Sequence, residues 1–211
     1  KFQPVPDLLE RIVSACRANG VRREEAAGER NSRILAVYSP AGGVGKSTLC
    51  LHLLRLWKRE RIRAVYVSLE TVISDGLFGS GDWEQLSARF LYTLERRSGQ
   101  FKERWRESVR RHGTFDFETL PPLMHLRDGM RLTEHAVARC LTTLRDSGEY
   151  DAILVDLDSG CNERIVAAFR TADDIVSLVK AIQNQQTELL LLVDPIAGEM
   201  GERARELIDE L

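Results

Sequence analysis

The composition of the 211-residue chain, 43% hydrophobic and 29% charged, suits one α/β domain with a sizeable core. A net charge of −2 gives no overall electrostatic attraction to nucleic acid. The four cysteines are scattered without a Cys-x-x-Cys pair, which argues against a disulfide framework or a zinc site and favours a reducing cytoplasm. No apolar run approaches the roughly 20 residues of a membrane-spanning helix.

The N-terminal part of the chain predicts a junction that precedes the main domain. Residues 7–18 have apolar side chains at helical spacing, so we assign residues 1–19 to a helix that follows an upstream domain absent from this sequence. Residues 20–32 are charged and nearly without large apolar side chains, which is typical of a flexible linker. Because the chain begins at Lys1 in the middle of a pattern, we expect it to be a piece of a longer protein. The main domain is assigned to residues 33–211.

A strand, a glycine loop, a helix and a second strand open this domain. Residues 33–38, RILAVY, form a short apolar run of strand type. Residues 46–59 place leucines and a tryptophan on one helical face. Residues 63–70, RAVYVSLE, predict the next strand. This succession is a βαβ unit, in which the two strands are parallel.

The middle of the chain is more helical. Residues 83–94 carry an apolar stripe behind an Asp82 cap, and Phe101, Trp105 and Val109 form another stripe. The pair Pro121-Pro122 interrupts the pattern, and Thr133 then caps a third helix. Its inward residues are expected to be Val137, Cys140, Leu141 and Leu144.

The remaining elements include two clear strands and an ambiguous tail. Residues 150–160, YDAILVDLDSG, predict a buried strand that ends in acids, and residues 173–179, DDIVSLV, predict a further strand. Residues 187–195, TELLLLVDP, are compatible with either strand or helix by periodicity. Residues 198–211 are expected to be helical. The fold class is therefore α/β, a mostly parallel doubly wound sheet with helices on both faces.

The stretch YSPAGGVGKSTLC, residues 38–50, predicts a phosphate-binding loop. The backbone N–H groups of a glycine-rich turn and a helix N-terminus converge on a phosphate, and glycines permit the close approach. Lys46 supplies a cation to the β and γ oxygens, and the Ser47 hydroxyl is placed to ligate Mg²⁺. Pro40 departs from the strict pattern, which has glycine there. The candidate ATP-binding residues are Gly42, Gly43, Val44, Gly45, Lys46, Ser47 and Thr48.

Acidic residues end two of the predicted strands. Asp156 is expected to bind Mg²⁺ through water, and together with Ser47 it completes the predicted metal site. Glu70 ends the strand beside the loop strand and would face the crevice where α/β folds bind ligands, so we assign Glu70 and Asp156 the catalytic roles. A solvated edge position is the alternative for Glu70. Asp158 is equally compatible with a surface acid and a catalytic role, and Gly160 lets the next turn approach the γ-phosphate.

Taken in order over about residues 33–180, these motifs resemble the MinD/ParA group of P-loop ATPases. GGVGKST resembles the group's deviant Walker A motif, VSLE its acidic switch segment, YDAILVDLDSG its Walker B strand, and TADDIVSLV a later strand. Within the group, KFQPVPDLLERI and YSPAGGVGKSTL are similar to the CpaE/TadZ proteins of type IV pilus assembly. Those proteins have a receiver-like domain upstream of the ATPase domain. The family fold normally continues beyond this sequence, so the ATPase domain is expected to be incomplete at its C-terminus.

The resemblance also implies a change in activity. Ala41 stands where the group has a signature lysine, which reaches the partner's phosphates across an ATP-sandwiched dimer. Glu70 stands at the group's switch aspartate. Since a cation that stabilises the transferred phosphoryl group is worth several powers of ten in rate, Ala41 predicts weak or absent hydrolysis. We expect the chain to bind ATP and Mg²⁺ and to form an ATP-dependent homodimer.

The expected function is that of a cytoplasmic localisation factor that helps position a pilus or secretion assembly. Its partners would recruit it to a cell pole or to the inner face of the membrane. One alternative is an active ParA-like ATPase that positions DNA or cargo, and another is a P-loop phosphotransferase or kinase.

Two surfaces bear on these alternatives. Acids interleave with the basic cluster, which favours a solvated face over a DNA site, and residues 201–211 are too acidic for a basic membrane helix. The basic cluster consists of Arg96, Arg97, Lys102, Arg104, Arg106, Arg110 and Arg111.

Overall fold

The computed structural model describes residues 32–71, 78, 82–95, 100–113, 116–183 and 186–195. The predicted junction helix, the predicted linker before Ser32 and the predicted C-terminal helix lie outside these ranges. Ser32 itself is buried, and its hydroxyl donates to the Tyr150 carbonyl at 2.7 Å.

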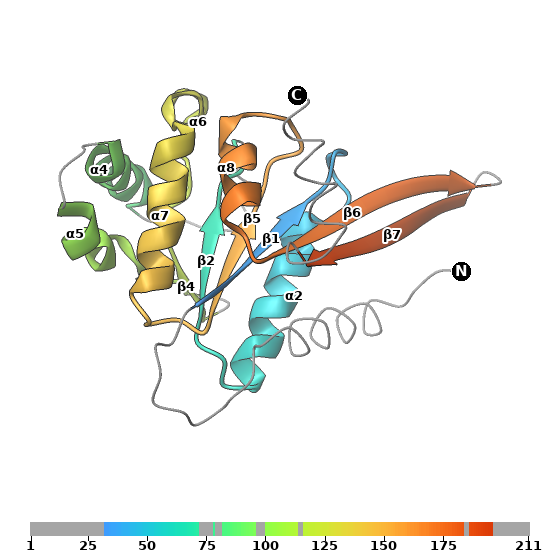
Figure 1. Ribbon diagram of the computed structural model, residues 1–211, viewed down its shortest axis with the longest axis horizontal. Helices are drawn as coiled ribbons and strands as arrows, with labels where there is room; N and C mark the ends of the chain where they lie inside the picture. The colour runs from blue at the N-terminus through green and yellow to red at the C-terminus, as the bar shows by residue number, and fades with distance from the viewer. Residues whose placement is uncertain are drawn as a thin grey trace.

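A sheet of seven strands in the order β3-β4-β2-β5-β1-β6-β7 forms the centre of the molecule (Figure 1). Its five inner strands run parallel, whereas β3 and β7 pair antiparallel to their neighbours at the two edges. The predicted mostly parallel sheet is therefore confirmed. The expectation that the strand ending at Glu70 lies beside the loop strand is wrong, because β5 pairs with both and separates β2 from β1. The strands are β1 (Arg33–Tyr38), β2 (Ala64–Ser68), β3 (Arg110–Arg111), β4 (Glu118–Thr119), β5 (Ala152–Asp156), β6 (Asp174–Gln183) and β7 (Gln186–Pro195).

Helices cover both faces of the sheet (Figure 1). α2 packs on one face, where it shares a core with Leu35 and Val37 of β1, and α4, α5, α7 and α8 pack on the other, which holds Ile34 and Ala36. Because both faces of β1 are buried, its sequence is a continuous apolar run rather than an alternating one. The helices are α2 (Lys46–Arg59), α4 (Trp83–Glu95), α5 (Gln100–Ser108), α6 (Leu126–Arg131), α7 (Glu134–Asp146) and α8 (Glu163–Thr171).

Local signals explain where the best-defined elements begin. The Thr133 hydroxyl accepts the N–H of Ala136 at 3.3 Å and caps α7 as predicted, and Asn162 caps α8 in the same way. The two-residue strands β3 and β4 and the helices α6 and α8 were not predicted. The ambiguous segment 187–195 forms the strand β7, because its backbone pairs with β6 over the whole of that strand.

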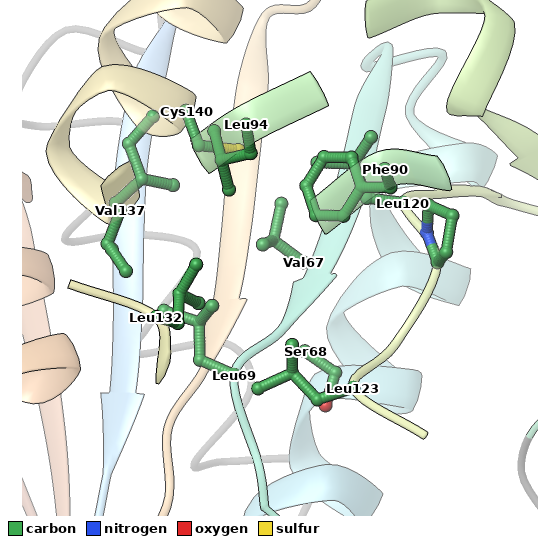
Figure 2. Close-up of a pocket in the computed structure, with 12 residues that line it drawn as sticks. Val67, Ser68, Leu69, Phe90, Leu94, Leu120, Leu123, Leu132, Val137 and Cys140 are labelled. Carbon is green, nitrogen blue, oxygen red and sulfur yellow. The ribbon is translucent and has the colours of Figure 1, made fainter. Parts of the chain in front are cut away.

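A small apolar cavity lies between β2 and the helices α4 and α7. Figure 2 shows Phe90 and Leu94 of α4 and Val137 and Cys140 of α7 around Val67 of β2, among the residues that line the cavity. Its volume is about 10 Å³, which is room for about one water molecule. It is a packing gap in the core and far too small for a nucleotide.

The part of the chain that the structure describes contains no helix long and apolar enough to cross a membrane.

Candidate nucleotide-binding site

The glycine loop links the carboxyl end of β1 to the first turn of α2. Gly43 has φ +68° and Gly45 has φ +96°, which are left-handed conformations that favour glycine. Gly45 stands at the N-cap of α2, where no side chain caps the helix and no acid lies in the first turn. The first backbone N–H groups of α2 are therefore available to an anion.

Lys46 is the central cation of this loop. Although it is a lysine, it is buried, and its Nζ donates to the Ser159 hydroxyl at 2.8 Å and lies 3.5 Å from the Glu70 carboxylate. The first contact ties it to the segment after β5 and the second to the end of β2. Burying a cation is costly unless an opposite charge lies close to it, and Glu70 supplies that charge for Lys46.

Three other predicted site residues gather around Lys46. The Ser47 hydroxyl donates to Glu70 Oε2 at 3.4 Å. Asp156 is fully buried, its Oδ2 accepts the Tyr66 hydroxyl at 2.8 Å, and its Oδ1 has no hydrogen-bond partner among the described residues. Burial raises the pKa of Asp156, whereas the hydroxyls of Ser47 and Tyr66 and the charge of Lys46 act in the opposite direction.

These oxygen atoms fit a magnesium ion. The unpaired, buried Oδ1 of Asp156, the Ser47 hydroxyl and the Glu70 carboxylate are hard oxygen donors, which Mg²⁺ prefers, usually with water and substrate phosphates filling its other positions. The residues that the structure describes include no group of three His, Cys, Asp or Glu side chains that could hold a metal by themselves. A bound ion would thus depend on the nucleotide as well as on Ser47 and Asp156.

Glu70 is the acid best placed for proton exchange. Burial and the nearby Asp156 carboxylate raise its pKa from 4.5 to about 7, although Lys46 and Ser47 favour its ionised form. A partly buried carboxyl group that titrates near neutral pH can accept or release a proton. The alternative of a solvated edge residue does not describe it, since its side chain is 23% exposed and contacts both loop residues.

Asp158 belongs to a neighbouring network. Its carboxylate accepts the Thr71 hydroxyl and, at 2.7 Å, the N–H of Ser159, and it lies 3.6 Å from the Arg164 guanidinium. Partial burial opposes its ionisation, but these bonds and the cations outweigh burial and lower its pKa. Asp158 is therefore linked to the glycine loop through Ser159, whose hydroxyl accepts a hydrogen bond from Lys46.

The remaining loop positions differ in exposure. The backbone of Gly42 and Gly43 and the side chain of Thr48 are exposed, whereas Val44 is buried in the core beneath α2. Ala41 is partly buried against the same core, and its N–H donates to the Ser39 hydroxyl at 3.2 Å. Its methyl group carries no charge into the site.

Sequence reasoning missed four residues of this region. They are Tyr66, Thr71, Ser159 and Arg164, which hold Asp156, Asp158 and Lys46. Tyr66 could have been noticed because its side chain carries a hydroxyl group within a mostly apolar strand. The other three could not, because their contacts depend on which strand ends meet.

Three members of the basic cluster found in the sequence, Arg106, Arg110 and Arg111, make contacts within the molecule, whereas Arg104 is exposed. Arg106 pairs with Glu149 and Arg111 with Asp116. Arg110 donates to the carbonyls of Glu107 and Val109. These contacts agree with a solvated face rather than a free phosphate-binding surface.

No protein-family model matches the sequence, and no curated protein matches it. Solved structures do match. A cobyrinic acid a,c-diamide synthase from Mycobacterium smegmatis, with bound ATP analogue and magnesium, has a TM-score of 0.55 at 20% identity, over 69% of this chain and 57% of that one. A ParA family ATPase from Chlorobium tepidum TLS has a TM-score of 0.51 at 16% identity, over 69% of this chain and 60% of that one. The septum site-determining protein MinD of Pyrococcus horikoshii OT3, with Mg-ADP, has a TM-score of 0.52 at 17% identity, over 69% of this chain and 57% of that one.

The fold is that of the MinD/ParA-type P-loop NTPases. The chain spans only 57% to 60% of the length of these three structures. Two of them hold an adenine nucleotide or its analogue together with magnesium. The MinD/ParA-type fold predicted from the motifs is thus confirmed.

Proposed function

We propose that this chain binds Mg-ATP in the loop between β1 and α2, dimerises on it and hydrolyses it slowly or not at all. The observation that carries the proposal is the convergence of Lys46, Ser47, Glu70 and Asp156 beside a glycine loop with left-handed residues. The loop N–H groups and Lys46 would hold the phosphates. Ser47 directly, and Asp156 through water, would hold Mg²⁺, which neutralises charge on the phosphate oxygens when bound.

Weak hydrolysis follows from what the site lacks at one position. Ala41 offers a methyl group where the resemblance expects the lysine that reaches a partner's phosphates. Without such a cation, charge that develops on the transferred phosphoryl group is less stabilised. Glu70 could still accept a proton near neutral pH, so binding and slow turnover are compatible. Nucleotide would then act as a switch between monomer and dimer.

Light scattering is the direct test. The molar mass is measured with Mg-ATP, with Mg-ADP and without nucleotide, and Lys46→Ala serves as the control that keeps the fold but loses the loop cation. A dimer that forms with Mg-ATP alone, and not in Lys46→Ala, supports the switch. If the molar mass of the unaltered protein is the same with and without nucleotide, the proposed switch is contradicted.

Ala41→Lys tests the proposed cause of slow turnover. We expect it to raise phosphate release by at least about tenfold, because a catalytic cation supplied in trans is worth several powers of ten when fully engaged. Unchanged turnover in a protein that still dimerises would show that Ala41 is not what limits hydrolysis. Transfer of labelled γ-phosphate to protein would instead support the phosphotransferase alternative, and ATP-dependent, salt-sensitive DNA retardation would support the ParA-like one.

The role in positioning a pilus or secretion assembly rests on the resemblance to CpaE/TadZ proteins. A fluorescent fusion expressed in the native host tests it. Foci at a pole or at the assembly site, lost in Lys46→Ala, would support a localisation factor. A uniform cytoplasmic signal for both proteins would oppose it.

A further inference from the structure

Arg164 is a buried arginine that the proposed chemistry does not use. It lies in the first turn of α8, and its side chain is only 6% exposed. Its Nη2 donates to the Thr71 hydroxyl at 2.8 Å, and its guanidinium lies 3.6 Å from Asp158. Its Nη1 is buried without a hydrogen-bond partner in the described part of the chain. Burial lowers the pKa of Arg164, which Asp158 partly offsets.

The guanidinium joins three segments that are distant in sequence. Thr71 follows β2, Asp158 follows β5, and Gly129 belongs to α6. Thr71 closes the network by donating to Asp158. The contact with α6 is tight, since a Cβ added at Gly129 would lie 2.2 Å from Nη1 of the arginine.

Each of the first two segments continues directly into the nucleotide site. Thr71 is the next residue after Glu70, which contacts Lys46 and Ser47. Asp158 holds the N–H of Ser159, whose hydroxyl accepts from Lys46 at 2.8 Å. Arg164 is therefore linked to Lys46 by two routes. In each route the residue that contacts Arg164, Thr71 or Asp158, is the sequence neighbour of a residue that contacts Lys46.

We propose that Arg164 is the positioning residue of this site, which clamps the Glu70–Thr71 and Asp158–Ser159 segments in the geometry that binds the γ-phosphate. A buried guanidinium with one acidic partner is a costly way to stabilise a fold, whereas its planar fork fixes two loops at once. The inference rests on the proposed Mg-ATP binding. A purely structural role would make only the stability of the fold depend on Arg164. The positioning role also makes the preference for Mg-ATP over Mg-ADP depend on it.

Arg145 supplies a matched control. It is also a partly buried arginine, it pairs with a single acid, Asp173, at 3.3 Å, and its Nε is likewise buried without a partner. It donates to the carbonyl of Thr171, the last residue of α8, whereas Arg164 lies in the first turn of that helix. Arg145→Gln and Arg164→Gln therefore remove comparable interactions from the two ends of α8.

The experiment measures the affinities of the full chain for Mg-ATP and Mg-ADP by calorimetry. For Arg164→Gln we expect Mg-ATP to bind about tenfold more weakly and Mg-ADP to change by less than about threefold, the usual scale of coupling between a positioning group and a ligand. Arg145→Gln should leave both affinities as in the unaltered protein. Thr71→Val, which keeps the side-chain shape and removes the hydroxyl, should shift the ATP-to-ADP ratio in the same direction and serves where Arg164→Gln does not fold.

The outcomes separate the two proposals. If the unaltered protein does not bind Mg-ATP, the proposed function fails and the positioning role fails with it. If it binds and either Arg164→Gln or a folded Thr71→Val keeps the original ATP-to-ADP ratio, the positioning role is refuted and the proposed function stands. A loss of affinity in Arg145→Gln equal to that in Arg164→Gln would also refute it, because the effect would then be one of general stability.

Discussion

Replacement of Glu70 by glutamine tests the electrostatics of the site in the absence of metal and nucleotide. Glutamine keeps the shape of the protonated side chain and cannot ionise. In the unaltered protein, burial and the neighbouring Asp156 raise the pKa of Glu70 from 4.5 to about 7. Folding therefore opposes the ionisation of this group, and Glu70→Gln removes that opposition.

The sign and size of the effect follow from this shift. Between about pH 4.5 and about pH 7 the folded protein keeps a proton that the unfolded chain has released, so the free energy of unfolding falls as pH rises through this window. At about 1.4 kcal/mol per pKa unit the full shift corresponds to roughly 3 kcal/mol. Because the carboxyl group retains some solvent contact, screening reduces the expected effect to about 2 kcal/mol.

The assay is urea unfolding at several pH values between 4.5 and 8, with EDTA present. We expect Glu70→Gln to match the unaltered protein near the acidic end and to be about 2 kcal/mol more stable at pH 8. Glu107→Gln, at an exposed position on α5, corrects for the loss of one negative charge. Parallel stability curves for Glu70→Gln and the unaltered protein would refute the assignment of a raised pKa to Glu70.

Three further predictions concern the same region. Lys46→Ala should abolish Mg-ATP binding in calorimetry while urea unfolding stays cooperative; retained binding would contradict the role of this cation. Tyr66→Phe removes the hydroxyl that donates to Asp156 and should lower the free energy of unfolding by about 2 kcal/mol, as expected for a buried bond to a charged group; an unchanged urea midpoint would show that the bond contributes nothing. Gly129→Ala should lower the melting temperature although alanine is the better helix former, since its Cβ would lie 2.2 Å from Nη1 of Arg164, and Thr71 and Asp158 hold that side chain in place. Gly113→Ala, which has open space around it, should not, and equal melting temperatures would argue against the tight contact.

The sequence predicted those elements whose side chains carry a strong local pattern. β1, β2 and β5 are apolar runs because both faces of the inner strands are buried. α2 and α7 have a clear apolar face and defined starts. α8 was missed because its buried face includes Arg164, which interrupts the apolar pattern, and its Asn162 cap was the one local signal of its start.

The candidate site divides in the same way. The glycines, Lys46 and Ser47 form a contiguous motif whose chemistry can be derived from local spacing, and the strand-end position of Asp156 follows from the parallel sheet. The contact of Lys46 with Ser159 joins residues 113 positions apart. This contact forms because β1 and β5 are neighbours in the sheet. No local sequence pattern predicts that strand order.

The place of β1 in the sheet also affects how the chain must fold. β1 is the first described strand, yet it lies between β5 and β6, so that Arg33 pairs with Ala152 and Leu35 with Asp174. Such distant pairings slow folding, because a long loop must close before the contacts form. During synthesis, the apolar β1 would wait on the order of ten seconds for its first neighbour to leave the ribosome. Exposure to aggregation in that interval would lower the yield of folded protein.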